Sequence, residues 1–395
     1  MKILAVNSSS RSLKFSLFEM DDESIICNGI VNNIGMNDSK YIIKYKDDNI
    51  SEVINVEDHY NAVKLIIDKI ITLNIIDSID DIFAVGHRII HGKDIYNRSV
   101  IIDNEVLHVL EDLTNLTPVN MKGNLDTIKA CMELLPNTRM VGVFDTAFHQ
   151  TIEKRDYLYP VPYEWFEKYS VRKYGFYGIN HKYIAEEVKK LLGKDEFKLI
   201  SCHLGNGASV CAIKDGLSVD TSMGFTPLSG VMMGTRCGDI DSSIIPYIME
   251  KEGKNALEVI YDLNKNSGLL GISEYSSDME DIIERSNEND EKATLALKKY
   301  VRRVVDYIGE YYLLLGGIDV LVFTGGVGEN SIPVRREICE ALELLGVKIN
   351  LDENQKTKEF VKISTEESKI QVYVIPSNEE IMIARDTINL VRNGI

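Results

Sequence analysis

Residues 198–214, KLISCHLGNGASVCAIK, join two apolar segments through a glycine turn. The apolar residues of KLISCHL and SVCAIK predict two strands, and GNGA between them predicts a tight turn. A similar unit opens the chain, where Lys2–Val6 and Leu13–Phe18 flank the hydroxyl-rich turn Asn7–Ser12. Two copies of one strand–turn–strand unit, each at the start of a half of the chain, predict an internal duplication.

Helical and strand patterns alternate between and after these two units. The expected helices are His59–Leu73, Asn124–Leu135, Ile179–Leu192 with Asn180 as its N-cap, Glu291–Leu315 and Glu380–Val391. The expected strands are Ile82–Val85, Arg139–Phe144, Val320–Phe323 and Gln371–Ile375. Because such alternation is typical of layered α/β proteins, we expect this fold class.

A chain of 395 residues is longer than one hydrophobic core usually serves, so two domains are expected. The boundary is predicted near Ala147–Thr151. The first domain then comprises residues 1–148 with the C-terminal helix 381–395, and the second comprises residues 149–380. Arg155–Tyr174, rich in Tyr, Pro and Trp, is interpreted as a loop or an interface.

Charge and cysteine usage exclude several classes of partner and location. The net charge of −17 argues against nucleic acid or an anionic membrane surface as the partner. No apolar run is long enough to cross a membrane, and the first residues make a poor signal peptide. Six cysteines without paired spacing favour reduced thiols in a cytoplasmic protein.

Three turns that follow strands are candidates for holding phosphate. Asn7–Ser12, Gly205–Ser209 and Gly325–Asn330 can each present backbone N–H groups to an anion. One such turn would be weak support, but three favour a nucleotide held between two domains. The sequence lacks GxxxxGK[ST] and GxGxxG, which argues against a P-loop or a Rossmann site. His203 and Lys14 are candidate phosphate contacts, although an edge-strand lysine equally fits a solvent-exposed position.

The segment 220–241, DTSMGFTPLSGVMMGTRCGDID, places Arg236 between Gly234 and Gly238. Glycines allow close approach of the backbone, and the arginine fork suits a carboxylate or a phosphate. The alternative is a mobile loop whose arginine pairs with Asp239 or Asp241. The neighbouring Cys237 is interpreted either as a thiol with a lowered pKa or, more simply, as a small filler.

Eight segments, in order over nearly the whole chain, resemble the acetate kinase family. They are NSSSRSLKFSLF, GHRIIHG, VFDTAFH, YGFYGINH, HLGNGAS, DTSMGFTPLSGVMMGTRCGDID, FTGGVGEN and SNEEIMIARDT. The resemblance implies two duplicated ribonuclease H-like domains of the actin and Hsp70 type, an active-site cleft between them, and a homodimer. It implies reversible transfer of the ATP γ-phosphoryl group to acetate, giving acetyl phosphate and ADP, with Mg²⁺ or alternatively Mn²⁺.

The resemblance also implies roles for individual positions. Arg88 matches the arginine that binds the carboxylate, and Arg236 matches the arginine that stabilises the transferring phosphoryl group. Asp145 matches the aspartate that orients the substrate or moves a proton, and Tyr177 stands beside the phosphoryl group. Asn7 and Glu379 match the positions associated with the metal ion. The positions that match nucleotide contacts are Lys14, His203, Leu204, Gly205, Asn206, Gly207, Asp278, Met279, Glu280, Gly326, Val327, Gly328, Glu329 and Asn330. Those that match the pocket around the substrate methyl group are Ile90, Val119, Phe176 and Pro227.

The chain departs from the family pattern at several of these positions. Tyr177 and Asn120 stand where the family usually has histidine, and Glu280 replaces an arginine. Ser9 and Arg11 replace the usual Gly and Ser of the first phosphate loop. Two alternatives follow: a kinase for propionate or another short carboxylate, and a divergent paralogue that binds nucleotide with little turnover. Ile90, one methylene larger than the usual valine, favours acetate over longer acids. Gly326 leaves room for adenine and so favours a nucleotide donor.

Overall fold

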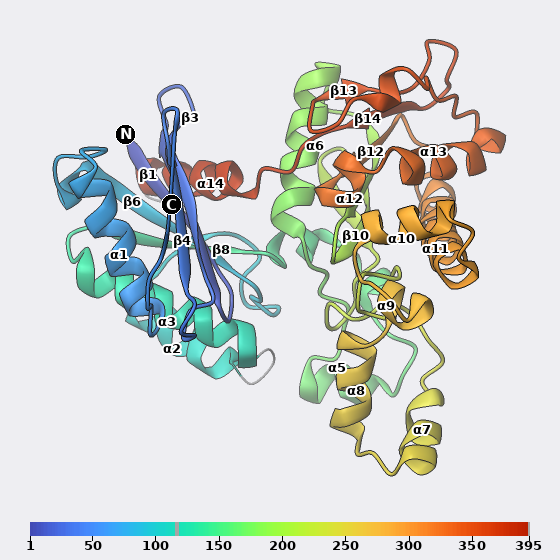
Figure 1. The fold of residues 1–395 in the computed structure, drawn as a ribbon, viewed down its shortest axis with the longest axis horizontal. Helices are drawn as coiled ribbons and strands as arrows, with labels where there is room; N and C mark the ends of the chain where they lie inside the picture. Colours follow the sequence, from blue (N-terminus) through green and yellow to red (C-terminus); the bar gives the residue numbers. More distant parts are fainter. Residues whose placement is uncertain (115–117, 394–395) are drawn as a thin grey trace. The chain divides into compact units, whose positions relative to one another are not determined.

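The computed structural model describes residues 1–114 and 118–393. The chain divides into two compact units, of which the first comprises Met1–Phe148 with Asn378–Ile395 and the second comprises His149–Ser377. Each unit contains one mixed β-sheet with helices packed against it (Figure 1). Short 3₁₀ helices lie at Ile79–Asp81, Ala147–Thr151, Glu343–Leu345 and Glu353–Gln355.

The sheet of the first unit has eight strands, in the order β5-β4-β3-β2-β1-β6-β8-β7. They are β1 (Lys2–Ser8), β2 (Ser12–Glu19), β3 (Ser24–Asn32), β4 (Lys40–Tyr45), β5 (Asp48–Val53), β6 (Ile82–Ile89), β7 (Val100–Ile101) and β8 (Arg139–Phe144). The helices are α1 (His59–Thr72), α2 (Asn104–Leu113), α3 (Pro118–Leu134) and α14 (Glu379–Asn393). Strands β1, β6 and β8 are parallel neighbours, so their carboxyl ends meet at one edge of the sheet.

Both faces of this sheet are covered. Helices α1 and α3 lie side by side over one face, where their apolar stripes join Val85 and Ile89 of β6 in a single core (Figure 1). Gly86 points to the other face, against α14, where a Cβ atom would overlap Thr387 Oγ1 and lie 2.7 Å from Ile383 Cγ2. The close approach of α14 to β6 brings the first residue of that helix, Glu379, to the carboxyl edge of the sheet.

The sheet of the second unit has six strands, in the order β11-β10-β9-β12-β14-β13. They are β9 (Lys198–Leu204), β10 (Ala208–Lys214), β11 (Leu217–Thr221), β12 (Val320–Thr324), β13 (Val361–Lys362) and β14 (Gln371–Val374). The helices are α4 (Lys154–Tyr157), α5 (Tyr163–Tyr169), α6 (Gly178–Leu192), α7 (Ile244–Glu252), α8 (Ala256–Lys265), α9 (Gly268–Ser273), α10 (Met279–Asn287), α11 (Glu291–Leu315), α12 (Gly325–Asn330) and α13 (Ile332–Ala341).

One topology occurs in both sheets. In β3-β2-β1-β6-β8 and in β11-β10-β9-β12-β14, three antiparallel strands are followed by two strands parallel to the third. A short antiparallel strand, β7 or β13, then borders each fifth strand. The duplicated α/β fold predicted from the two strand–turn–strand units is therefore confirmed.

Several predicted elements differ from those observed. The predicted strand Ile82–Val85 continues to Ile89, because residues 86–89 keep their pairing with the neighbouring strands β1 and β8. The helix predicted at Asn124 begins at Pro118, which is a favourable first position because a proline lacks an N–H group. Gly325–Asn330, predicted as a turn, forms the short helix α12, and the predicted loop Arg155–Tyr174 contains α4 and α5.

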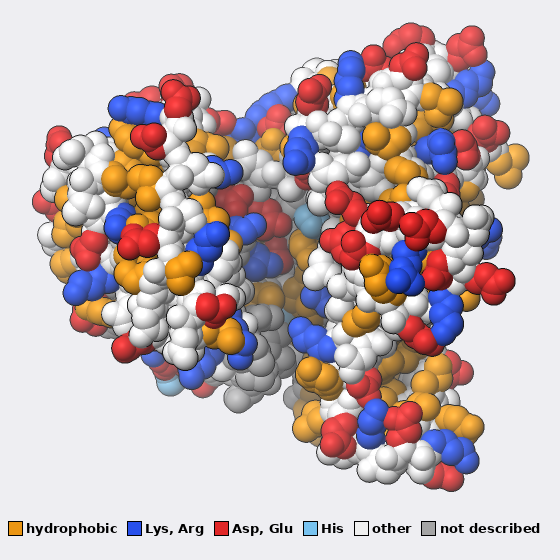
Figure 2. Space-filling view, viewed as in Figure 1, with side chains coloured by type: hydrophobic (Ala, Val, Ile, Leu, Met, Phe, Trp, Pro, Cys, Tyr) orange, Lys and Arg blue, Asp and Glu red, His pale blue; other side chains and the backbone are white. Residues whose placement is uncertain are grey.

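The surface carries charges of both signs, and acidic side chains gather over α10 (Figure 2). This helix contains Glu280, Asp281 and Glu284. Within residues 1–114 and 118–393, no helix is both long and apolar enough to cross a membrane.

Candidate active site

Four of the predicted site residues meet at the carboxyl edge of the first sheet. Asn7 belongs to β1, Arg88 to β6, Asp145 follows β8, and Glu379 begins α14. Arg88 Nη2 lies 2.8 Å from Asp145 Oδ2, and Arg88 Nη1 donates to Asn7 Oδ1 at 3.4 Å. Glu379 Oε2 lies 3.5 Å from Asn7 Nδ2 and 4.0 Å from Arg88 Nε. A single cluster therefore contains one cation, two carboxyl groups and one amide.

The ion pair between Arg88 and Asp145 is largely shielded from water. The Asp145 side chain is 1% exposed and that of Arg88 is 16% exposed. The backbone N–H of Asp145 also donates to Ile89 O at 2.9 Å, which fixes the aspartate beside the end of β6. Asp145 thus orients a guanidinium group, whose planar fork matches the two oxygens of a carboxylate.

Burial raises the pKa of Glu379 from its ordinary value of 4.5 to about 7. Arg88 opposes this shift in the pKa of Glu379, while the negative charge of Asp145 adds to it. Near neutral pH this carboxyl group therefore lies between its protonated and charged forms, and a nearby cation would favour the charged form.

The oxygen ligands of this cluster suit a hard divalent cation. Asn7 and Glu379 supply an amide and a carboxylate oxygen, and Mg²⁺ commonly binds one or two protein oxygens together with water and substrate phosphates. Among the described residues, no group of three or more His, Cys, Asp or Glu side chains is arranged to hold a metal ion. The cluster offers two protein oxygens, a number that fits an Mg²⁺ ion which also binds substrate phosphates.

Replacing Glu379 by glutamine is expected to stabilise the metal-free protein at pH 8 by about 2–3 kcal/mol and to change little at pH 4.5. Between about pH 4.5 and 7 the folded chain keeps the proton that the unfolded chain releases, so stability falls as the pH rises. Urea unfolding at both pH values measures the effect, with Glu105→Gln, an exposed glutamate of the same unit, as the control. Equal pH dependence in wild type and Glu379→Gln would contradict it.

The remaining predicted residues of the first unit lie on β2, just after β6 and in α3. Lys14 of β2 is exposed and pairs in register with Asn7, and its charge lowers the pKa of Glu379. The backbone N–H of Ile90 donates to the buried Asn124 amide at 3.2 Å. Val119 and Asn120 lie in the first turn of α3, and their side chains are outside the part of the chain that the structure describes.

Four predicted segments gather in the second unit, around the turn after β9. The N–H of Gly234 donates to Asn206 O at 3.1 Å, and a Cβ atom at Gly234 would lie 2.9 Å from Ser277 O. A Cβ atom at Gly205 would lie 3.7 Å from the nitrogen of Gly326. The segments 205–207, 234–236, 277–280 and 325–330 are therefore neighbours, as a common phosphate-binding role requires.

Tyr177 and Arg236 lie beside Gly207 in this second cluster, and His203 stacks on Tyr177. The Tyr177 ring stacks on His203 with a centroid separation of 4.2 Å and an interplanar angle of 24°. A Cβ atom at Gly207 would overlap the Tyr177 hydroxyl and lie 3.4 Å from Arg236 Nη1. Tyr177 is itself the N-cap of α6, with φ of 58°, so the prediction that Asn180 caps this helix is wrong.

The partners of Arg236 decide between the two interpretations of its loop. Its Nη1 donates to Pro227 O at 3.2 Å and lies 3.5 Å from Met233 Sδ. Asp239 instead accepts from Arg303 and Tyr307, and Asp241 accepts from the N–H of Ser243. Among the described residues, no carboxylate forms an ion pair with Arg236, so the alternative interpretation, a loop whose arginine pairs with Asp239 or Asp241, is wrong. The backbone holds the guanidinium group while its charge stays available to an anion.

The other predicted nucleotide and substrate positions differ in exposure. Leu204, Met279 and Phe176 are buried, whereas Asp278, Glu280 and Gly326 are exposed. Asp278 caps α10 through the N–H of Glu280. Glu329 accepts from the N–H groups of Gly325 and Ser377, and Asn330 donates to Gly326 O. The structure places Val327 and Gly328 in α12 and Pro227 beside Arg236.

Sequence reasoning missed Arg335 of α13, because VRRE has the pattern of a solvated helix. Arg335 is 0% exposed and donates to the carbonyls of Gly328 and Glu329, the Asn354 side chain, and the carbonyls of Asn354 and Lys356. Burial lowers the pKa of Arg335 to about 10, so the group stays charged at neutral pH. This buried cation fixes the end of α12.

Replacing Gly207 by alanine is expected to lower kcat about 10- to 100-fold, because the new methyl group would displace the Tyr177 hydroxyl beside Arg236. Steady-state kinetics measures the loss. Gly309→Ala is the matched control, since no atom lies within 4 Å of a Cβ at that position. Equal activity of the two variants would show that the space at Gly207 is not required.

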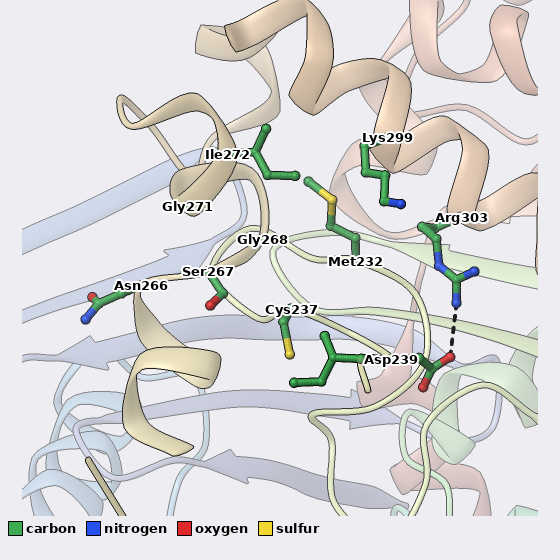
Figure 3. Close-up of a pocket in the computed structure, with 11 residues that line it drawn as sticks. Met232, Cys237, Asp239, Asn266, Ser267, Gly268, Gly271, Ile272, Lys299 and Arg303 are labelled. Carbon is green, nitrogen blue, oxygen red and sulfur yellow. Dashed lines mark hydrogen bonds and ion pairs between the residues drawn. The ribbon is translucent and has the colours of Figure 1, made fainter. Parts of the chain in front are cut away.

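A pocket of about 540 Å³ is lined by residues of the segments 232–240, 266–272 and 299–303 (Figure 3). Met232, Cys237, Asp239 and Arg303 are among its lining residues, and none of the predicted site residues is. Burial raises the pKa of Cys237, so the interpretation of this residue as a thiol with a lowered pKa is wrong.

Comparisons with known proteins cover both units. The model of the acetokinase family matches residues 2–385. Acetate kinase of Bacillus cytotoxicus is 47% identical over 395 residues, which is 100% of both chains. The crystal structure of Porphyromonas gingivalis acetate kinase has a TM-score of 0.94 at 39% identity, covering 99% of each chain. A propionate kinase from Francisella tularensis has a TM-score of 0.93 at 36% identity, covering 98% of this chain and 99% of its own. The resemblance drawn from the eight motifs is confirmed, and the chain belongs to the acetokinase family.

Proposed function

We propose that this chain transfers the γ-phosphoryl group of ATP reversibly to acetate, giving acetyl phosphate and ADP. Membership of the acetokinase family implies ATP or ADP as a co-substrate. The observation that supports the proposal most is the Arg88–Asp145 pair beside Asn7 and Glu379. This cluster provides an oriented cation for a carboxylate next to oxygen ligands for a metal ion.

The chemistry explains why two arginines are needed. A carboxylate is a weak nucleophile and carries the same sign of charge as the phosphoryl group that it attacks. Arg88 binds and orients the acetate, so that one carboxylate oxygen attacks phosphorus in line with the departing ADP oxygen. Arg236 stabilises charge on the transferring group, and the Tyr177 hydroxyl donates a hydrogen bond beside it.

Asn7 and Glu379 would hold Mg²⁺ or Mn²⁺, which neutralises phosphate charge when bound. The glycine segments 205–207 and 326–328, with His203, bind the nucleotide phosphates through their N–H groups. Asp145 keeps the Arg88 fork in its orientation.

The alternative acceptor is propionate, since the chain is 36% identical to a protein named propionate kinase. Ile90 favours acetate, and one methylene group is worth about 1–3 kcal/mol in such a pocket. We further propose a homodimer and a cytoplasmic location, the latter because all six cysteines are free thiols.

Trapping acyl phosphate with hydroxylamine tests the proposal directly. With Mg-ATP, acetate is expected to give the highest kcat/KM, followed by propionate and then butyrate. A higher kcat/KM for propionate would reassign the acceptor. Nucleotide binding without acyl phosphate from any short carboxylate would overturn the enzyme proposal in favour of the divergent paralogue.

A further inference from the structure

We propose that Asn180 is a positioning residue, which fixes the protonation of the His203 ring so that Nε2–H points toward the phosphate-binding segments. This role rests on the proposed nucleotide binding, because it gives His203 a donor for an acceptor-only phosphate. Neither the family motifs nor the expected N-cap assign such a role to Asn180.

The contact between Asn180 and His203 determines which ring nitrogen carries the proton. Asn180 is 0% exposed, and its Nδ2 lies 2.9 Å from His203 Nδ1. An amide nitrogen can only donate a hydrogen bond, so Nδ1 must accept it. The single proton of the neutral imidazole then lies on Nε2.

The opposite edge of the His203 ring faces Gly325, the first residue of α12. A Cβ atom at Gly325 would lie 3.1 Å from His203 Nε2 and 3.2 Å from Cδ2. His203 also pairs in register with Thr324, so the two strand ends lie side by side. A phosphate near Gly325 and Gly326 would therefore meet an N–H donor in the proposed tautomer and a lone pair in the opposite one.

The ring is held on its face as well as its edge. Tyr177 stacks on His203, and Tyr177 and Asn180 lie three residues apart at the start of α6. The next residue, His181, bonds to the hydroxyls of Ser201 and Ser209, each at 3.0 Å. The hydrogen bonds of His181 to these two hydroxyls make it an internal reference in the same helix.

The competing arrangement is a reversed amide. Within the described part of the chain, the buried Oδ1 of Asn180 has no hydrogen-bond partner. If the Asn180 amide group were rotated by 180°, its Oδ1 would accept a hydrogen bond from His203 Nδ1–H. The lone pair of Nε2 would then face Gly325. The two arrangements predict opposite tautomers, so a spectroscopic measurement separates them.

Nitrogen-15 NMR of histidine-labelled full-length protein reads the tautomer without requiring turnover. The His203 signals are assigned by their loss in His203→Gln. In the nucleotide-free wild type we expect unprotonated Nδ1 and protonated Nε2 at His203. Protonated Nδ1 in the wild type would overturn the proposal.

Two variants then connect the tautomer to nucleotide binding. Asn180→Leu is expected to give a mixture of tautomers and to weaken Mg-ATP binding about tenfold, measured by calorimetry. Asn180→Asp is expected to move the proton to Nδ1. Ser201→Ala, the control, should shift only the His181 signals and leave Mg-ATP affinity unchanged.

An unchanged tautomer and unchanged Mg-ATP affinity in Asn180→Leu would also overturn the role. Failure of the phosphoryl-transfer proposal would give a different result. The wild type would then bind Mg-ATP and show the expected tautomer, but it would form no acyl phosphate.

Discussion

Replacing Arg236 by alanine is expected to lower kcat by about 10³-fold or more while the protein stays folded. Arg236 donates to Pro227 O, and no described carboxylate neutralises its charge. Such a preorganised cation acts mainly on the charge of the transferring group, so its loss lowers kcat more than it raises the KM for ATP. Initial rates of acetyl hydroxamate formation over a range of ATP concentrations measure both constants.

Arg236→Lys and Arg303→Ala test the origin of this loss. Lysine keeps the charge but not the planar fork, so we expect only partial recovery of kcat. Arg303 pairs with Asp239 in the same unit and is not part of the candidate site, so Arg303→Ala should keep wild-type turnover. A turnover within tenfold of wild type in Arg236→Ala would exclude the proposed role.

Replacing Arg88 by alanine is expected to lower kcat/KM for acetate by about 10²- to 10³-fold and also to destabilise the first unit. The variant loses the fork that we propose binds the carboxylate, and it leaves Asp145, 1% exposed, without its cation. Removing one partner of a buried ion pair typically costs about 3–5 kcal/mol of stability. Kinetics with varied acetate and urea unfolding measure the two effects.

A second change separates the stability effect of Arg88 from its catalytic effect. In Arg88→Ala with Asp145→Asn, the isolated buried charge is gone, so stability should largely return while activity does not. Recovery of activity together with stability would mean that Arg88 acts only through folding.

The elements predicted most accurately are those whose signals are local. Helix α11, Glu291–Leu315, has the predicted bounds because Asp290 caps it and Gly316 ends it in a left-handed conformation. Strand β8 likewise keeps its predicted bounds. In contrast, the start of α6 could not be predicted, because Tyr177 adopts a positive φ that stacking on His203 supports from a distant strand.

The candidate site shows the same division between local and distant information. Arg88 and Asp145 follow apolar strands, so their position at a sheet edge could be inferred from the sequence. The local sequence around Glu379 has the pattern of an ordinary first helical turn. Only the family resemblance indicated a metal-binding role for this residue. The contacts of Asn180 with His203 and of Arg335 with Asn354 were missed, because these partners lie in other segments and no sequence pattern indicates them.

The packing of Gly86 against Ile383 and Thr387 has a consequence for the folding of the first unit. One face of the first sheet stays uncovered until α14, which follows the whole second unit in the sequence, has packed against β1 and β6. The same helix delivers Glu379. A variant truncated after Ser377 would therefore lack both the cover of its first sheet and one of the two proposed metal ligands, so the packing of α14 couples completion of the first unit to assembly of the candidate site.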